Sequence, residues 1–128
     1  MKAALMGAFI LTVTLGTRSF AQSPTLPADA SKGEALYHDC KAAVKFMDGI
    51  TDDTTAFGAA VCESYIEGFT DSGILSGAAA TAYCFDANTS NAVVVRVYVQ
   101  YMESHPKLMD LPKFMGLAQA LHANYPCK

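Results

Sequence analysis

The sequence has no tryptophan, and positive charge is scarce in it. Nine lysines and arginines stand against twelve aspartates and glutamates, so the formal net charge is −3. Nucleic acids and anionic lipids bind clusters of Lys and Arg, which this chain does not supply. We therefore expect no nucleic acid among its partners, and a basic protein would suit its charge better.

The sequence patterns of common catalytic and cofactor sites are also missing. The chain contains no G-x-S-x-G, no phosphate-binding loop and no C-x-x-C-H for haem attachment. Its four cysteines form no C-x-x-C pair and no cluster with histidines, so no zinc site is expected. These absences predict a protein that is not an enzyme and that uses no cofactor.

The remaining candidates for chemistry are scattered. His38 and Asp39 are neighbours, but adjacent residues of a helix point in different directions. His105 and His122 each stand apart from any nucleophile pattern. Carboxylates at i+4 steps are typical of a solvated helix face, and the sequence has one such series: Glu63, Glu67 and Asp71.

The first 21 residues are expected to be a signal peptide. Lys2 provides the positive end, and Ala3–Gly16 is an apolar run too short to span a bilayer comfortably. Ser19–Ala21 fits the small-x-small cleavage pattern, which predicts a mature chain beginning at Gln22. That chain has seven basic and twelve acidic residues, a net charge of −5. We expect an exported protein with no membrane span after cleavage.

The rest of the chain fits one small domain. Residues 22–30 contain proline and serine and are expected to be a flexible lead-in. Residues 31–128 have the length of a single core. The apolar patterns predict four helices arranged as two antiparallel helical hairpins, an all-α fold.

The first hairpin begins with a sequence pattern that is typical of a helix N-terminus. Ser31 and Glu34 match the S-x-x-E capping box, and the first helix is expected to run to Asp48–Gly49. The second helix is expected from Thr54 to Ser76, with Gly68 as a close packing contact. Its predicted apolar face repeats at i+4 steps: Phe57, Val61, Tyr65 and Phe69, with Cys62 and Ile66 beside them.

The second hairpin starts from an ambiguous segment. Valines alternate with polar residues from Val93 onward, as in a strand, but the alternation fails at Glu103 while a helical stripe continues. We therefore predict a helix. Pro112 suits the first turn of the last helix. Its apolar positions recur at helical intervals: Phe114, Leu117, Ala118, Leu121 and Tyr125.

Four cysteines in a short exported chain indicate disulfides, for which three pairings exist. The predicted antiparallel hairpins favour one of these three pairings. Cys40 and Cys62 lie on the two helices of the first hairpin, and Cys84 and Cys127 lie at the two ends of the second. We predict the pairs Cys40–Cys62 and Cys84–Cys127.

The chain resembles the Rap/Tai family, immunity proteins that neutralise type VI secretion amidase effectors. The resemblance covers about Lys32 to Cys127 and depends on C-x-x-Y-I-x-G after Cys62 and on the terminal Tyr125–Pro126–Cys127. It departs from the family pattern at Asp86, where a proline is usual.

The resemblance implies a periplasmic helical protein, commonly a homodimer, that occludes the active site of a peptidoglycan amidase. Polar loop residues are the expected contacts with this partner: Asp48, Asp52, Asp53, Asp86 and Asn88. Two alternatives stay open. One is a periplasmic acid-stress chaperone, and the other is a small secreted hydrolase.

Overall fold

The computed structural model describes residues 28–77 and 82–128, and these residues are mostly helical. The elements in chain order are η1 (Ala28–Ser31), α1 (Gly33–Met47), α2 (Asp53–Ser76), α4 (Asn91–Ser104), η2 (Pro106–Leu108) and α5 (Lys113–Asn124). The predicted all-α fold is confirmed. The predicted signal peptide and most of the predicted lead-in lie outside the described residues, and the end of the lead-in forms η1.

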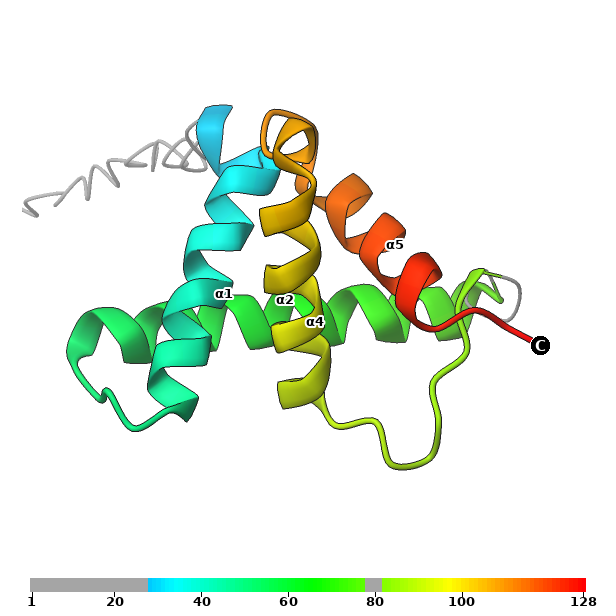
Figure 1. The fold of residues 1–128 in the computed structure, drawn as a ribbon, viewed down its shortest axis with the longest axis horizontal. Coiled ribbons are helices and arrows are strands. Elements are labelled where there is room, and N and C mark those ends of the chain that lie inside the picture. Colours follow the sequence, from blue (N-terminus) through cyan, green and yellow to red (C-terminus); the bar gives the residue numbers. More distant parts are fainter. Residues whose placement is uncertain (1–27, 78–81) are drawn as a thin grey trace, which may run out of the picture.

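The helix α2 is the base on which the other three helices are assembled. It runs behind α1 and α4 in Figure 1, and α5 lies beside α4. α4 and α5 run in opposite directions, whereas α2 turns across α1 instead of lying alongside it (Figure 1). Gly58 allows this close crossing, because a Cβ at that position would meet the Ala42 Cβ at 2.5 Å.

The N-terminus of α1 is capped by the other hairpin. Lys32, and not Ser31, is the N-cap residue, and its side chain makes no capping hydrogen bond. The backbone N–H groups of Gly33 and Glu34 donate to the carbonyls of Leu111 (2.7 Å) and Met109 (3.0 Å). The predicted Ser31–Glu34 capping box is therefore wrong, because backbone acceptors distant in sequence occupy the first turn.

The N-terminus of α2 is capped locally, by the polar turn before it. The Asp52 side chain accepts from the Thr55 backbone N–H at 2.8 Å, and the Thr55 hydroxyl accepts from the Asp52 backbone N–H at 3.0 Å. This reciprocal pair is a capping box. Gly77 then ends the helix with a positive φ of 73°, a conformation that glycine adopts without strain.

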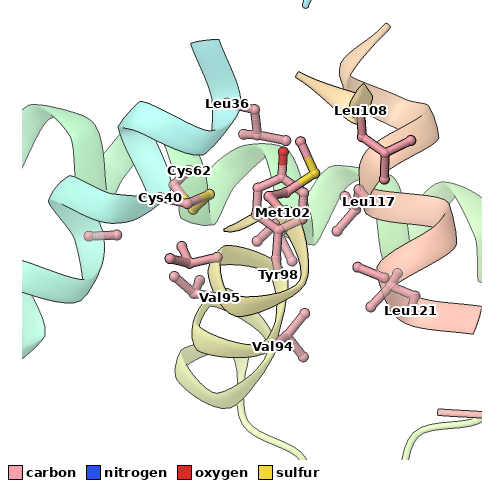
Figure 2. Close-up of a cluster of buried hydrophobic side chains, with 14 of the residues drawn as sticks. Leu36, Cys40, Cys62, Val94, Val95, Tyr98, Met102, Leu108, Leu117 and Leu121 are labelled. Atoms are coloured by element: carbon pink, nitrogen blue, oxygen red, sulfur yellow. A yellow bond between two sulfur atoms is a disulfide. The ribbon is translucent and has the colours of Figure 1, made fainter. Parts of the chain in front are cut away.

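Tyr98 of α4 is the centre of the core, where all four α-helices meet (Figure 2). Its side chain is fully buried, in the same hydrophobic cluster as Leu36 of α1, Ile66 of α2 and Leu117 of α5. Burial raises the pKa of the Tyr98 hydroxyl far above its usual range. Because the valine-rich segment forms the helix α4, the prediction of a helix there is confirmed.

The buried face of α2 is rotated from the predicted one. Cys62 and Ile66 are fully buried, but Phe57 is 71% exposed, and Val61 is only half-buried. Gly68 is exposed, and a Cβ added there would meet no atom within 4 Å, so its predicted packing role is wrong. α1 approaches α2 at the other end of the helix, so the close contact is made at Gly58.

On α5, the predicted apolar face is largely confirmed. Leu117 and Leu121 are fully buried, and Tyr125 packs at the edge of the core. Phe114 is 52% exposed, which the periodicity does not indicate. Next to it, Lys113 turns back onto α2 and places its ammonium 4.5 Å from the ring centre of Tyr65.

Both predicted disulfides are confirmed. The Cα atoms are 5.0 Å apart in Cys40–Cys62 and 4.9 Å apart in Cys84–Cys127. The first bridge is fully buried between α1 and α2 (Figure 2). The second closes the α4–α5 half, where the Cys84 backbone N–H also donates to the Tyr125 carbonyl at 2.8 Å. In the chain-entropy model each closure stabilises the fold by about 3–4 kcal/mol.

Across residues 28–77 and 82–128, no helix has the length and apolar character that a membrane crossing requires.

Candidate partner-binding site

The predicted contact residues fall into two separate loops. Asp48, Asp52 and Asp53 belong to the α1–α2 turn, and Asp86 and Asn88 belong to the segment that leads into α4. The two loops lie on opposite sides of the first turn of α4 (Figure 1). The structure therefore does not bring the five residues into one patch.

Two of the five side chains already have partners within the chain. Asp48 accepts from the Arg96 guanidinium at 2.6 Å, which joins the end of α1 to α4. The hydrogen bond from the Thr55 backbone lowers the pKa of Asp52, so this carboxylate stays ionised as the cap of α2. Both residues stabilise the fold, and their carboxylates are less available to a partner.

The other three residues are exposed. Asp53 lies in the first turn of α2, Asp86 accepts a turn hydrogen bond through its backbone carbonyl, and Asn88 follows in the same loop. Among the described residues, no hydrogen bond or ion pair engages these three side chains. They remain predictions as partner contacts.

The histidines are held in structural contacts. His38 lies 3.6 Å from the Glu34 carboxylate on the exposed side of α1. His105 stacks on Tyr101 with ring centres 4.0 Å apart, and the Nδ1 atom of His122 lies 2.8 Å from the Ala82 carbonyl. The Ser104 hydroxyl lies 3.0 Å from the Nδ1 atom of His105, and it also donates to the Tyr101 carbonyl at 2.8 Å, so it is held in a local contact at the end of α4.

Asp39 is the carboxylate with the most unusual environment. Burial raises its pKa, while the nearby positive charge of Lys113 opposes this effect. Its backbone carbonyl also lies against Gly58, at the crossing of α1 and α2. No three His, Cys, Asp or Glu side chains of the described chain are grouped as metal ligands, Asp39 included. The residue is part of the helix contact and faces no second acid.

The hollows in the surface are mostly shallow. A largely apolar one of about 330 Å³ lies between α2 and α5 and is lined by Phe69, Gly73, Tyr83 and Ala118, among others. The buried hydroxyls of Tyr83, which lines this hollow, and of Tyr125 have no hydrogen-bond partner in the described chain. No cysteine thiol is free among the described residues to act as a nucleophile there.

The exposed apolar residues are the feature that sequence reasoning missed. The largest exposures on one helix belong to Phe57 (71%), Ile74 (64%) and Leu75 (89%) of α2. The sequence does indicate that some apolar residues of α2 must be exposed. α2 carries apolar residues on nearly every face, and a helix in a small domain can bury only one face.

Fold and surface together define a small helical protein with two disulfides and with exposed apolar residues on its longest helix. A family model described as Rap1a immunity proteins matches residues 32–127, three quarters of the chain. The chain belongs to this family, which confirms the resemblance. Searches of the curated proteins and of the solved structures gave no match.

Membership in this family implies a role in effector immunity. An immunity protein acts by binding a cognate effector, so it needs a complementary surface and no catalytic group of its own. Both disulfides lie within the matched residues, so the bonded frame described above is the part of the chain that the family shares.

Proposed function

We propose that this protein is a periplasmic immunity protein that binds a type VI secretion peptidoglycan amidase and occludes its active site. The observation that carries the proposal is the family match over residues 32–127. The predicted signal peptide, residues 1–21, and the two disulfides fit a protein that folds in an oxidising compartment. The periplasm is also where such an effector meets the cell wall.

In this proposal the inhibitor works as a rigid plug and is not an enzyme. A binder that is ordered before it meets its target loses little conformational entropy on binding. Two disulfides and the backbone hydrogen bonds from Gly33 and Glu34 to the η2–α5 loop hold the helices in place. Exposed loop residues, Asp53 and Asp86 among them, are available at its edges.

The direct test is protection of cells. The full chain and the amidase effector from the same strain are expressed together, with the effector sent to the periplasm, and lysis is scored. We expect protection by the full chain and none by a chain without residues 1–21, which stays in the cytoplasm. Continued lysis with the full chain, together with separate elution of the two purified proteins on a sizing column, would refute this function.

An acid-stress chaperone is a second candidate, because exposed apolar residues such as Phe57 and Leu75 could hold unfolded clients. Such a chaperone should lose structure or dissociate at low pH and should suppress aggregation of a denatured client there. We expect neither from this protein. Sedimentation across pH 4 to 7 tests this, and at neutral pH it also tests the homodimer that the resemblance implies.

A further inference from the structure

One face of α2 is exposed along the whole helix. Residues at steps of three and four share a helix face, and six such positions, together with Gly68, are all exposed: Asp53, Phe57, Ala60, Ser64, Asp71 and Leu75. We call these seven residues the outer stripe. A helix of 24 residues is about 36 Å long, so the outer stripe crosses the molecule from side to side.

No other described helix covers the outer stripe. α1, α4 and α5 pack against the opposite face of α2, on which Cys62 and Ile66 are fully buried (Figure 1). A Cβ built on Gly68 would meet no atom within 4 Å, which confirms open space at the middle of the stripe. The longest helix of the fold thus contributes one face to the core and leaves the other without a neighbour.

The outer stripe carries one large apolar side chain near each end. Phe57 is 71% exposed and Leu75 is 89% exposed. They are eighteen residues apart, which is about 27 Å along a helix. The small residues Ala60, Ser64 and Gly68 lie between them, so a partner backbone can approach closely. Aromatic side chains such as Phe57 are enriched at the cores of protein–protein interfaces, where a few side chains that fill pockets on the partner carry most of the binding energy.

The negative charge of α2 limits which partner can bind to this face. The sequence of α2 has four acids, Asp53, Glu63, Glu67 and Asp71, and no Lys, Arg or His. The ion pairs of the described chain involve Asp29, Glu34, Asp48 and Glu103, and none involves an acid of α2. The negative charge of this helix is therefore not neutralised by the protein itself.

This charge argues against two occupants. A second copy docked through the same face would bring the two acids of the outer stripe, Asp53 and Asp71, against the same two acids, and like charges that face each other at an interface oppose binding. An anionic lipid surface is repelled for the same reason. A protein surface rich in Lys and Arg is attracted instead, and the attraction speeds its encounter.

We infer that the outer stripe of α2 is the surface through which this protein holds its effector. The effector then presents a basic surface with two apolar recesses about 27 Å apart, one for Phe57 and one for Leu75. The inference depends on the proposed function and names the inhibitor's main contact surface. It gives the loop residues Asp86 and Asn88 a minor role.

The test measures binding of the purified mature chain to the amidase effector from the same strain. Two stripe variants are made. One is the apolar double variant, which combines Phe57→Ala and Leu75→Ala, and the other is the single charge variant Asp71→Lys. The matched controls lie off the stripe: Phe114→Ala removes a ring that is 52% exposed on α5, and Asp110→Lys reverses an exposed charge elsewhere. A further variant, Asp86→Lys, tests the loop as the rival contact and is not one of the controls.

We expect the apolar double variant to weaken binding by about tenfold or more, as loss of interface anchors does. Asp71→Lys should slow association several-fold at low salt, and the difference should shrink at high salt. The controls should stay within about twofold of the parent. Circular dichroism should show unchanged melting, because the substituted side chains are exposed. If the double variant melts earlier, Phe57→Ser alone repeats the test.

Three results would overturn the inference. Stripe variants that bind as the parent does, while Asp86→Lys abolishes binding, would assign the contact to the loop and leave the proposed function standing. Conversion of a parental dimer to a monomer by Phe57→Ala with Leu75→Ala would assign the stripe to a second copy. Failure of the parent itself to bind and protect would remove the proposed function and the inference together.

Discussion

Two glycines of α2 offer a matched test of how the first half of the fold packs. Gly58 faces α1, where an added Cβ would lie 2.5 Å from the Ala42 Cβ and 3.2 Å from the Asp39 carbonyl oxygen. Gly68 faces open space. Both are interior positions of one helix, so replacement by alanine brings the same gain in helix propensity at each.

The two substitutions should therefore have opposite effects. Gly68→Ala should stabilise the protein by roughly 0.5–1 kcal/mol, the difference in helix propensity between the two residues. Gly58→Ala gains the same amount but adds an overpacking cost of about 1–3 kcal/mol. That cost is hard to relieve, because the Ala42 Cβ and the Asp39 carbonyl are attached rigidly to the backbone.

The assay is guanidinium unfolding followed by circular dichroism, with both disulfides intact. We expect the free energy of unfolding to differ between the two variants by about 1–3 kcal/mol, which is the overpacking cost alone. For a domain of this size each kcal/mol corresponds to about 4–8 °C in melting temperature. Equal stability of Gly58→Ala and Gly68→Ala would refute the close crossing of α1 and α2.

Three further predictions concern titration and redox behaviour. Burial raises the pKa of Asp39, so ionisation of this carboxyl lowers the stability of the fold as pH rises. Thermal melts should show Asp39→Asn to be more stable than the parent at pH 7 and equally stable at pH 3. The pKa of Asp52 is lowered, so its effect on stability is opposite: the ionised carboxylate stabilises the fold, and this stabilisation is lost as the pH falls. Asp52→Asn keeps a capping side chain, so its melting temperature should drop less in acid than that of the parent. Mild dithiothreitol should open Cys84–Cys127, whose Cys84 is exposed, before the buried Cys40–Cys62, as read by alkylation and mass spectrometry.

Local features of the fold could be predicted from the sequence because local chemistry determines them. Asp52 caps α2 through a residue three positions away, and Ser90 caps α4 in the same way. The disulfides followed from the order of the helices, since each pair joins two neighbouring elements. The valine-rich helix followed from a single break in alternation at Glu103.

The errors all depend on where one helix lies relative to another. Ser31 has the right spacing for a capping box, but the η2–α5 loop supplies acceptors to α1 instead. Phe57 and Gly68 fit an apolar or close-packed face, yet α1 crosses at Gly58. A helix with apolar residues on most faces gives no sequence signal for its rotation, so tertiary contacts decide which face is buried.

The same limit applies to the candidate site. Loops usually carry contacts, so the sequence favours polar loop residues as partner contacts, but two of them, Asp48 and Asp52, make contacts within the chain. The exposed face of α2 could not be recognised as exposed until the rotation of the helix was known. Phe57 was assigned to the core for the same reason that the outer stripe was missed.

The two faces of α2 differ in what they contribute to the fold, and the proposed contact with the effector lies on the face that the core does not use. One face of α2 holds Gly58, Cys62 and Ile66 against the core, while the outer stripe makes no contact that the fold needs. Substitutions on the stripe therefore cost little folding free energy, which exposed positions typically tolerate within about 0.5 kcal/mol. If the proposed stripe contact holds, the protein can change its partner by altering the stripe while both disulfides and the core stay unchanged. A stripe variant that melts far below the parent would contradict this separation.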